Sequence, residues 1–276
     1  MRAAAATYVP VSTGAQVIPG YEVVALLAHG RRLDTYDAWD LDREARVVVK
    51  VLREDRLDDQ RVVEAVLQEG RLVTTLAHPH LVRGFAAYSD PRPALVLETL
   101  TGATLAALLE DGPLSASDAA QLGRQLTSVL GYLHRRDWLH LDVKPANVVV
   151  EHGRAVLIDL SLAGRPGTGR RGAGTRGYLA PEQALGQGLS AATDVWGLGV
   201  TLLESLTGEL PFGDEATWES RRRIPLLHRR LPRGPTGTVP AGVPAELTAA
   251  LRSAVAPAPG DRPTLAELRA VFEGLA

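Results

Sequence analysis

The sequence predicts an α+β protein whose strands and helices are segregated into two lobes. Segments with the alternation and β-branched content of strands gather before residue 100, whereas helical patterns dominate after it. The chain has 276 residues, which is more than one minimal core needs and few for three domains. We therefore expect a β-rich first lobe and a mostly helical second lobe, divided near Thr101.

The first lobe should contain an antiparallel meander with one main helix. Three strand-like segments lie between Tyr21 and Leu52, separated by polar turns at residues 30–32 and 42–44, and they read YEVVALLA, TYDAWD and RVVVKVL. A helix should follow, because valines in QRVVEAVLQEGRLVTTLA recur near helical spacing until His78-Pro79 ends the pattern. A further strand, ALVLETL, is expected before the boundary.

The second lobe should consist mainly of helices. Four segments have helical patterns and read TLAALLE, SDAAQLGRQLTSVLGYLHRR, TDVWGLGVTLLESLTG and AELTAALRSAV. The stretch LPRGPTGTVPAGVP is rich in proline and glycine, so we expect it to be a loop that separates the last helices. The sequence contains no internal repeat.

Composition excludes several classes of function. There is no cysteine, which rules out disulfides, thiolate metal sites and cysteine nucleophiles. The net charge is −2, and the clusters at residues 221–223 and 229–230 are short, so nucleic-acid binding is not expected. The first twenty residues do not resemble a secretory signal, and no apolar run reaches about 18 residues. We expect no membrane span and a cytoplasmic location.

A hairpin predicts a candidate metal site. The segment NVVVEHGRAVLID contains two apolar strands around His152-Gly153. If the hairpin is symmetric about Gly153, Asn147 lies opposite Asp159. An amide oxygen and a carboxylate are suitable ligands for Mg²⁺, which usually keeps water and takes phosphate oxygens as its remaining ligands. The alternative is that both residues are polar caps at the strand ends.

Two more polar residues lie just before this hairpin. Asp142 and Lys144 are expected in a loop that Pro145 keeps from being helical. Asp142 could accept a proton from an attacking hydroxyl, and Lys144 could neutralise charge on a transferring phosphate. The alternative is a loop salt bridge between them, which contributes little if it is exposed. Of 30 basic residues only Lys50 and Lys144 are lysines, which suggests that both positions require a compact ammonium.

These residues resemble the protein kinase family. His140-Leu141-Asp142, followed by Lys144, Pro145 and Asn147, is similar to the catalytic loop of protein kinases, the family that serves as a general template for phosphoryl transfer. Further matches follow the family's order and spacing: they are Lys50 in VVVK, Glu69 on the predicted helix, Asp159 in IDLS, GTRGYLAPE at residues 174–182, Asp194 in DVWGLG and Arg262 in GDRPT, which would pair with Glu182.

The resemblance implies a fold, cofactors and site residues. It implies the bilobal protein kinase fold over residues 21–272, with a first lobe at about 21–100 and a second at about 101–272, after an extension at 1–20. It implies that the cofactors are ATP and Mg²⁺, with Mn²⁺ as an alternative to Mg²⁺. It also implies a metal site at Asn147 and Asp159 and catalytic roles for Asp142, Lys144, Lys50 and Glu69. The nucleotide would bind residues from both lobes, which are Leu27, Gly30, Thr35, Val48, Lys50, Glu98, Leu100 and Val149.

Within the family, the class resembled is that of bacterial, eukaryotic-like serine/threonine kinases. Lys144, two residues after Asp142, and Thr175 in the activation segment are similar to the serine/threonine class rather than the tyrosine class. The implied partner is a protein substrate, which could include the chain itself.

Three motifs depart from the family pattern. The phosphate-covering loop AHGRRLDT keeps only Gly30, with Ala28 and Leu33 at the other glycine positions, so close backbone approach to phosphate is in doubt. Leu141 replaces the arginine that would bind a phosphorylated activation loop, which predicts little dependence on loop phosphorylation. DLS replaces DFG at residues 159–161.

Two other functions are compatible with the sequence. A pseudokinase would be a regulatory, nucleotide-binding module whose altered glycine loop no longer supports turnover. A small-molecule phosphotransferase would have a related lobe arrangement, although the intact APE and DVWGLG segments resemble the peptide-substrate machinery of protein kinases. An active serine/threonine kinase is the leading interpretation, because every residue with a direct chemical role is present.

Overall fold

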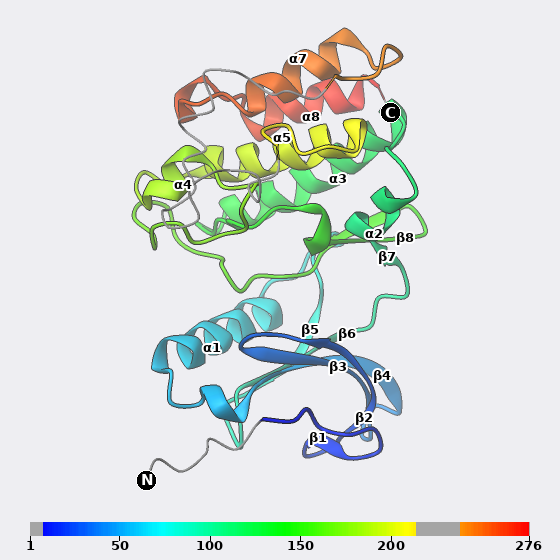
Figure 1. The fold of residues 1–276 in the computed structure, drawn as a ribbon, viewed down its shortest axis with the longest axis vertical. Coiled ribbons are helices and arrows are strands. Elements are labelled where there is room, and N and C mark those ends of the chain that lie inside the picture. The colour runs from blue at the N-terminus through cyan, green and yellow to red at the C-terminus, as the bar shows by residue number, and fades with distance from the viewer. Residues whose placement is uncertain (1–7, 214–237, 276) are drawn as a thin grey trace. The chain divides into compact units, whose positions relative to one another are not determined.

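Figure 1 shows the computed structural model of the chain, which describes residues 8–213 and 238–275. The basic clusters at 221–223 and 229–230, and residues 231–237 of the predicted loop, lie outside the described residues. The described chain forms two compact units. The first unit contains residues up to 78 together with 82–101, and the second contains 79–81 and the residues from 102 onward. The predicted α+β class is confirmed.

The first unit is built on a six-stranded sheet whose neighbouring strands are all antiparallel. The spatial order is β1-β2-β3-β4-β6-β5. The bounds are Gln16–Ile18 for β1, Tyr21–His29 for β2, Leu33–Asp40 for β3, Ala45–Leu52 for β4, Gly84–Tyr88 for β5 and Ala94–Glu98 for β6. β1 has only three residues, and β5 reads GFAAY, so neither has a strand pattern strong enough to be predicted from sequence.

One face of this sheet carries a continuous apolar core. Val23, Tyr36 and Val49 lie in it with Val17 and Ile18 of β1, and all are less than 9% exposed. Because side chains alternate across a strand, the residues between them face the other side of the sheet. Thr35 and Lys50 are register partners on that second face.

A single long helix packs on the sheet. α1, Gln60–Thr75, begins after Asp59, whose side chain accepts a hydrogen bond from the Val62 amide, and it contacts β5 and β6. Gly70 allows a close approach, because a Cβ there would come within 2.8 Å of both Ala87 Cβ and Leu95 Cδ2. The neighbouring residue, Glu69, is thereby held against the sheet.

The second unit is mainly helical. α3, Ala116–His134, contacts both α5, Ala191–Thr207, and α8, Leu265–Glu273, while α5 also contacts α7, Ala245–Ala254. Thirteen of the 17 residues of α5 are buried, including Asp194. The same unit contains two short helices, α2 at Leu105–Glu110 and α4 at Pro181–Leu185.

The predicted hairpin exists, but its register differs by one residue. β8, Val148–Glu151, pairs with β9, Arg154–Leu157, and β7, Ala103–Thr104, pairs with β8. His152 and Gly153 have φ of 49° and 77°, so the turn is a two-residue turn centred between them, not on Gly153. The predicted pairing of Asn147 with Asp159 is therefore wrong. The Asn147 carbonyl instead accepts the Ile158 amide at 3.0 Å.

Pro145 also acts differently from the expectation. It begins a 3-10 helix, η2, at Pro145–Asn147, instead of preventing helical structure. Proline is well suited to a first helical position, because the amide hydrogen that it lacks would have no partner inside the helix.

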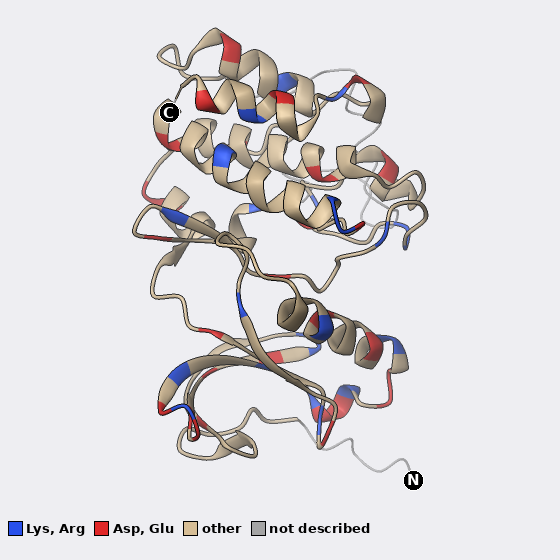
Figure 2. Ribbon diagram, turned by 180° about the vertical axis from the view of Figure 1, so that it is seen from behind, with Lys and Arg blue, Asp and Glu red and all other residues tan. Residues whose placement is uncertain are grey.

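Charged residues are spread through both units. Figure 2 shows acidic and basic positions interspersed along the described ribbon of each unit. Within the described residues, no helix is long and apolar enough to cross a bilayer.

Candidate active site

The loop that precedes η2 is held by a buried carboxylate of α5. Asp194, 1% exposed, accepts the backbone amides of His140 and Leu141, each at 2.8 Å. Its Oδ2 is also 2.8 Å from His134 Nε2. Leu141 has φ of 64°, which is unusual for a residue with a side chain. The two hydrogen bonds from a buried carboxylate hold the backbone in this conformation.

His140 also stabilises this loop, through a hydrogen bond from the loop's backbone. It is fully buried, and its Nδ1 lies 3.2 Å from the Asp142 amide, which donates to it. Nδ1 is therefore the unprotonated nitrogen of the ring. Burial lowers the pKa of His140, so the ring is neutral at physiological pH.

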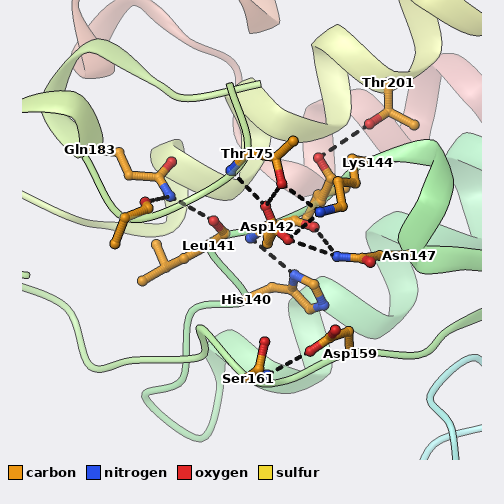
Figure 3. Close-up of polar contacts among 12 residues, drawn as sticks. His140, Leu141, Asp142, Lys144, Asn147, Asp159, Ser161, Thr175, Gln183 and Thr201 are labelled. Carbon is orange, nitrogen blue, oxygen red and sulfur yellow. Dashed lines mark hydrogen bonds and ion pairs between the residues drawn. The ribbon is translucent and has the colours of Figure 1, made fainter. Parts of the chain in front are cut away.

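The Asp142 carboxylate lies at the centre of a polar network (Figure 3). Its Oδ1 accepts the Thr175 amide at 3.0 Å and the Thr175 hydroxyl at 2.7 Å. Its Oδ2 accepts Lys144 Nζ at 2.7 Å and Asn147 Nδ2 at 3.0 Å. Four donors from three residues therefore fix the orientation of one carboxylate.

Lys144 bridges two of these groups. Its Nζ contacts Asp142 Oδ2 and also donates to the Thr175 hydroxyl, whose own hydrogen is directed at Asp142. The side chains of Lys144 and Asp142 are only 18% and 11% exposed. The loop salt bridge named as the alternative is therefore present, but it is largely shielded from solvent, so the small contribution of an exposed pair does not apply to it.

Asn147 is oriented by the same loop. Its amide nitrogen donates to the Asp142 backbone carbonyl at 2.8 Å as well as to the carboxylate, so its amide oxygen is directed away from Asp142, as Figure 3 shows. Asp159 follows β9, and its Oδ1 accepts the Ser161 amide at 2.8 Å. Leu160 and Ser161 replace the usual phenylalanine and glycine, respectively, and Leu160 is buried at 1% exposure.

The donor chemistry of Asn147 and Asp159 fits a hard divalent cation. Both offer oxygen ligands, and the tethered nitrogen of Asn147 leaves its oxygen as the available end. The described residues contain no cluster of three or more His, Asp or Glu suited to a metal. A site with two protein ligands is typical of Mg²⁺ bound together with phosphates and water.

Within the first unit, an ion pair joins β4 to α1. Lys50 Nζ lies 2.9 Å from Glu69 Oε1, and the two side chains are 14% and 1% exposed. Lys50 projects from the face of the sheet opposite the apolar core, where the close approach of α1 at Gly70 brings Glu69 within reach. The structure therefore brings together the two residues that the family resemblance had associated.

The predicted nucleotide-binding residues divide between the units. Seven belong to the first unit. Thr35 and Val48 lie on the same face of the sheet as Lys50, and Leu27, on β2, is 56% exposed. Gly30 is in the β2–β3 turn, Glu98 is the last residue of β6, and Leu100 follows two residues later. Val149, 7% exposed, belongs to β8 of the second unit.

A second charge pair stabilises the helical unit. Arg262 donates to both oxygens of Glu182, at 2.6 and 2.8 Å, and its side chain is 0% exposed. It also donates to the backbone carbonyls of Ala192 and Ala256. This bidentate pair ties α4, at the end of the activation segment, to the start of α5 and the loop before α8.

Two supporting residues had no role assigned from sequence. Asp194 anchors the catalytic loop, and Gln183 donates to the backbone carbonyls of Leu141 and Ala173 at 2.6 and 2.8 Å. The sequence analysis matched Asp194 to the family pattern through DVWGLG but gave it no structural role; a second signal was its charge in an otherwise apolar helical pattern. Gln183 gave no such signal, because a polar residue near a helix start is common.

Comparison with known proteins identifies the family to which this arrangement belongs. The profile of the protein kinase domain matches residues 21–271. The serine/threonine-protein kinase PknB of Mycolicibacterium smegmatis is 33% identical over 276 residues, which cover 93% of this chain and 43% of that protein. The serine/threonine-protein kinase PkaA of Streptomyces coelicolor is 34% identical over 244 residues, covering 83% and 44%.

A more distant relative has the same kind of name. The serine/threonine-protein kinase PrkC of Bacillus subtilis is 28% identical over 211 residues, covering 74% of this chain and 33% of that protein. The chain thus spans less than half the length of each of these relatives. A protein kinase domain implies the use of ATP, a divalent metal ion and protein substrates. From the match over residues 21–271, we conclude that the chain belongs to the protein kinase family.

Proposed function

We propose that the chain is an active serine/threonine protein kinase that transfers the γ-phosphoryl group of ATP to a protein hydroxyl. The observation that carries this proposal is the network of Asp142, Lys144 and Thr175. It holds one carboxylate and one ammonium in fixed orientation beside each other. Phosphoryl transfer depends mainly on positioning and on stabilisation of charge, and this network supplies both.

Asp142 would act on the substrate hydroxyl. Its carboxylate accepts the hydrogen bond of the attacking hydroxyl, aligns the oxygen for in-line attack on the γ-phosphorus, and takes up the proton as the new P–O bond forms. The bond to the β-phosphate oxygen breaks, and ADP is the leaving group. Lys144 would neutralise charge on the transferring group, because its Nζ lies 2.7 Å from the carboxylate that would receive the attacking hydroxyl.

Specificity for serine and threonine is supported by two features. Lys144 and Thr175 interact directly with each other and with Asp142, and this pair is what resembles the serine/threonine class. The relatives reported above carry the name serine/threonine-protein kinase.

Asn147 and Asp159 would hold the divalent metal, and Mg²⁺ is the proposed ion, with Mn²⁺ as an alternative. Both metals accept oxygen ligands, and an amide oxygen with a carboxylate does not distinguish them. When bound, such an ion supplies neutralisation of phosphate charge. Asn147 would present a neutral amide oxygen to the ion, and Asp159 would present a charged carboxylate oxygen.

Lys50 and Glu69 would position the nucleotide. A lysine beside a carboxylate that is 1% exposed is held extended from the sheet, so its ammonium is presented to phosphate oxygens in a defined place. The residues Leu27, Gly30, Thr35, Val48, Glu98, Leu100 and Val149 are proposed to surround the nucleotide. Arg31 or Arg32, both exposed beside Gly30, would compensate for the missing glycines by contacting phosphate.

The proposal includes a protein substrate, which could be a second copy of the chain, and a cytoplasmic location. The location is supported by the need for ATP.

The test is transfer of labelled phosphate from ATP to a mixture of unfolded proteins, followed by analysis of the phosphorylated amino acids. The proposal predicts phosphoserine and phosphothreonine with no phosphotyrosine, and a loss of transfer by about 10²–10⁴ in Asp142→Asn. Nucleotide binding without any transfer would support a pseudokinase. Transfer to small molecules alone would support a small-molecule phosphotransferase.

A further inference from the structure

The turn between β2 and β3 is held by a buried carboxylate at a position of the phosphate-covering loop for which the family pattern specifies no residue. Asp34 is 0% exposed, and its carboxylate has three side-chain partners. Oδ1 lies 2.8 Å from His29 Nδ1, and Oδ2 accepts the Tyr8 hydroxyl at 2.7 Å and the Tyr36 hydroxyl at 3.3 Å. A charge buried this completely is tolerated only because these donors surround it.

The network continues into the turn through Arg53. Arg53 donates to the Gly30 carbonyl at 2.9 Å and lies 3.3 Å from His29 Nε2, while its backbone amide donates to the Arg32 carbonyl at 3.0 Å. Asp55 holds the same guanidinium through two hydrogen bonds of 2.9 Å. Two carbonyls of a three-residue turn are thereby fixed to Arg53, the residue that directly follows β4.

A segment outside the family match completes the network. The Tyr8 ring stacks on His29 with centroids 6.2 Å apart, and the Arg53 guanidinium lies 4.7 Å from the centre of the Tyr8 ring. Three residues later, the Val11 amide donates to the Tyr36 hydroxyl at 2.9 Å. Burial and the hydrogen bond to Asp34 raise the pKa of Tyr8, so its hydroxyl remains a donor.

The backbone of the turn itself has little freedom. The Gly30 amide donates to the Leu33 carbonyl at 3.0 Å, and a Cβ at Gly30 would lie 2.4 Å from that carbonyl oxygen. Ala28 and Leu33 occupy positions at which the family pattern has glycine. The turn is thus short and braced where a glycine-rich loop would be mobile.

We propose that residues 8–11 and Asp34 form a brace that fixes the phosphate-covering turn, and that Asp34 is a positioning residue for nucleotide binding. The link to nucleotide rests on the proposed kinase function. The brace replaces the conformational adaptability of three glycines with a preformed turn, which lowers the entropy lost when a nucleotide binds. Loosening it should weaken nucleotide binding and leave the phosphoryl-transfer step largely unchanged.

The test compares Tyr8→Phe and Asp34→Asn with a matched control, Tyr21→Phe. Tyr8→Phe keeps the ring and removes only the hydroxyl directed at Asp34. Tyr21→Phe removes a hydroxyl of the same sheet, which lies 3.0 Å from Tyr88 and takes no part in the brace. Amide hydrogen exchange of residues 28–34 measures the turn in the protein without nucleotide, and titration with Mg²⁺ and a fluorescent ATP analogue measures affinity.

The brace predicts faster exchange of residues 28–34 and a roughly three- to ten-fold higher Kd for the analogue in Tyr8→Phe, with a larger effect in Asp34→Asn. KM for ATP should rise by a similar factor while kcat changes less than about two-fold. Tyr21→Phe should match the wild type. Exchange in Tyr8→Phe equal to the wild type, or an equal increase in Tyr21→Phe, would overturn the proposal.

The two proposals fail in different ways. If the wild type binds no nucleotide, the proposed kinase function fails, and the exchange comparison still decides whether the brace exists. If the wild type binds nucleotide and transfers phosphate, but Tyr8→Phe has unchanged exchange and unchanged KM, the brace alone is refuted.

Discussion

Thr175 donates twice to Asp142, through its amide at 3.0 Å and its hydroxyl at 2.7 Å, both to Oδ1. The two residues are separated by 33 positions, so this contact joins the activation segment to the catalytic loop. Because the same hydroxyl accepts a hydrogen bond from Lys144, it holds the ammonium and the carboxylate in a fixed relation. Order in the activation segment is thereby coupled directly to the proposed catalytic base.

Replacing Thr175 by valine should reduce activity without unfolding the protein. Valine has a similar shape and lacks the hydroxyl that links Lys144 to Asp142. We expect kcat to fall by roughly 10- to 100-fold, the effect of losing one or two hydrogen bonds that position a catalytic group. Thr175→Ser keeps the hydroxyl and should retain most activity. Equal activity of the valine and serine variants in a steady-state assay would argue against this role.

Thr168→Ala should leave activity within about two-fold of the wild type. Leu141 occupies the position from which an arginine would bind a phosphorylated loop, and its Cδ1 would lie 3.3 Å from a Cβ at Gly164, so it packs against the start of the segment. Thr168 is exposed and takes no part in the Asp142 network. A large loss of kcat in Thr168→Ala, with intact nucleotide binding, would show that loop phosphorylation controls this enzyme.

Lys50→Met should destabilise the fold as well as abolish activity. The change leaves a carboxylate of 1% exposure without its ammonium, which typically costs about 3–5 kcal/mol. Adding Glu69→Gln removes the buried charge, so the double variant should regain much of the free energy of unfolding while remaining inactive. Denaturant unfolding of the two variants measures this. If the single and the double variant had the same free energy of unfolding, the loss of stability in Lys50→Met would not come from the unpaired charge of Glu69.

Arg262→Lys should lower the free energy of unfolding by about 3 kcal/mol, because a lysine cannot reproduce a buried bidentate pair together with the donations to backbone carbonyls. Arg269→Lys is the matched control. Arg269 pairs with Glu273 on the surface of α8, where both side chains are 49% exposed, so its loss should cost less than about 0.5 kcal/mol. Similar losses for both variants would contradict the structural role assigned to Arg262.

His140 should make the fold less stable in mild acid. Its pKa is lowered in the folded state by burial, so below about 6.5 the unfolded chain binds a proton that the folded protein does not. The contribution of the neutral ring to the free energy of unfolding is therefore fully present above that pH. It is lost as the pH falls toward the lower pKa of the folded state. The melting temperature should fall less steeply between pH 7 and pH 5.5 in His140→Phe than in the wild type. Parallel curves would exclude this contribution.

Local patterns in the sequence predicted the elements with strong periodicity. β2, β3, β4, β6, α1, α3 and α5 all have regular apolar spacing, and each observed element overlaps its predicted segment, with ends that differ by no more than two residues. β1, β5 and α4 have three to five residues each, which is too short for a period to be detected. The hairpin register was wrong because apolar alternation does not determine whether a turn has two residues or three.

The site was predictable only where residue type carried the chemistry or where the family resemblance supplied the partner. Lys50 and Glu69 are 19 residues apart on a strand and a helix, and Asp142, Lys144 and Asn147 lie within one short segment. Asp194 lies 54 residues from His140, and Tyr8 lies 26 from Asp34. Such contacts depend on how whole elements pack, so no local pattern reveals them.

The central claim is that Asp142 and its partners catalyse phosphoryl transfer. Its most direct test is intact mass analysis of the purified chain and an added protein substrate after incubation with Mg²⁺ and ATP, alongside Asp142→Asn treated identically. We predict mass increments of whole phosphate groups with the wild type, and none with Asp142→Asn at equal time and concentration. Equal increments with both proteins would contradict the role of Asp142, and their absence from both would contradict an active kinase.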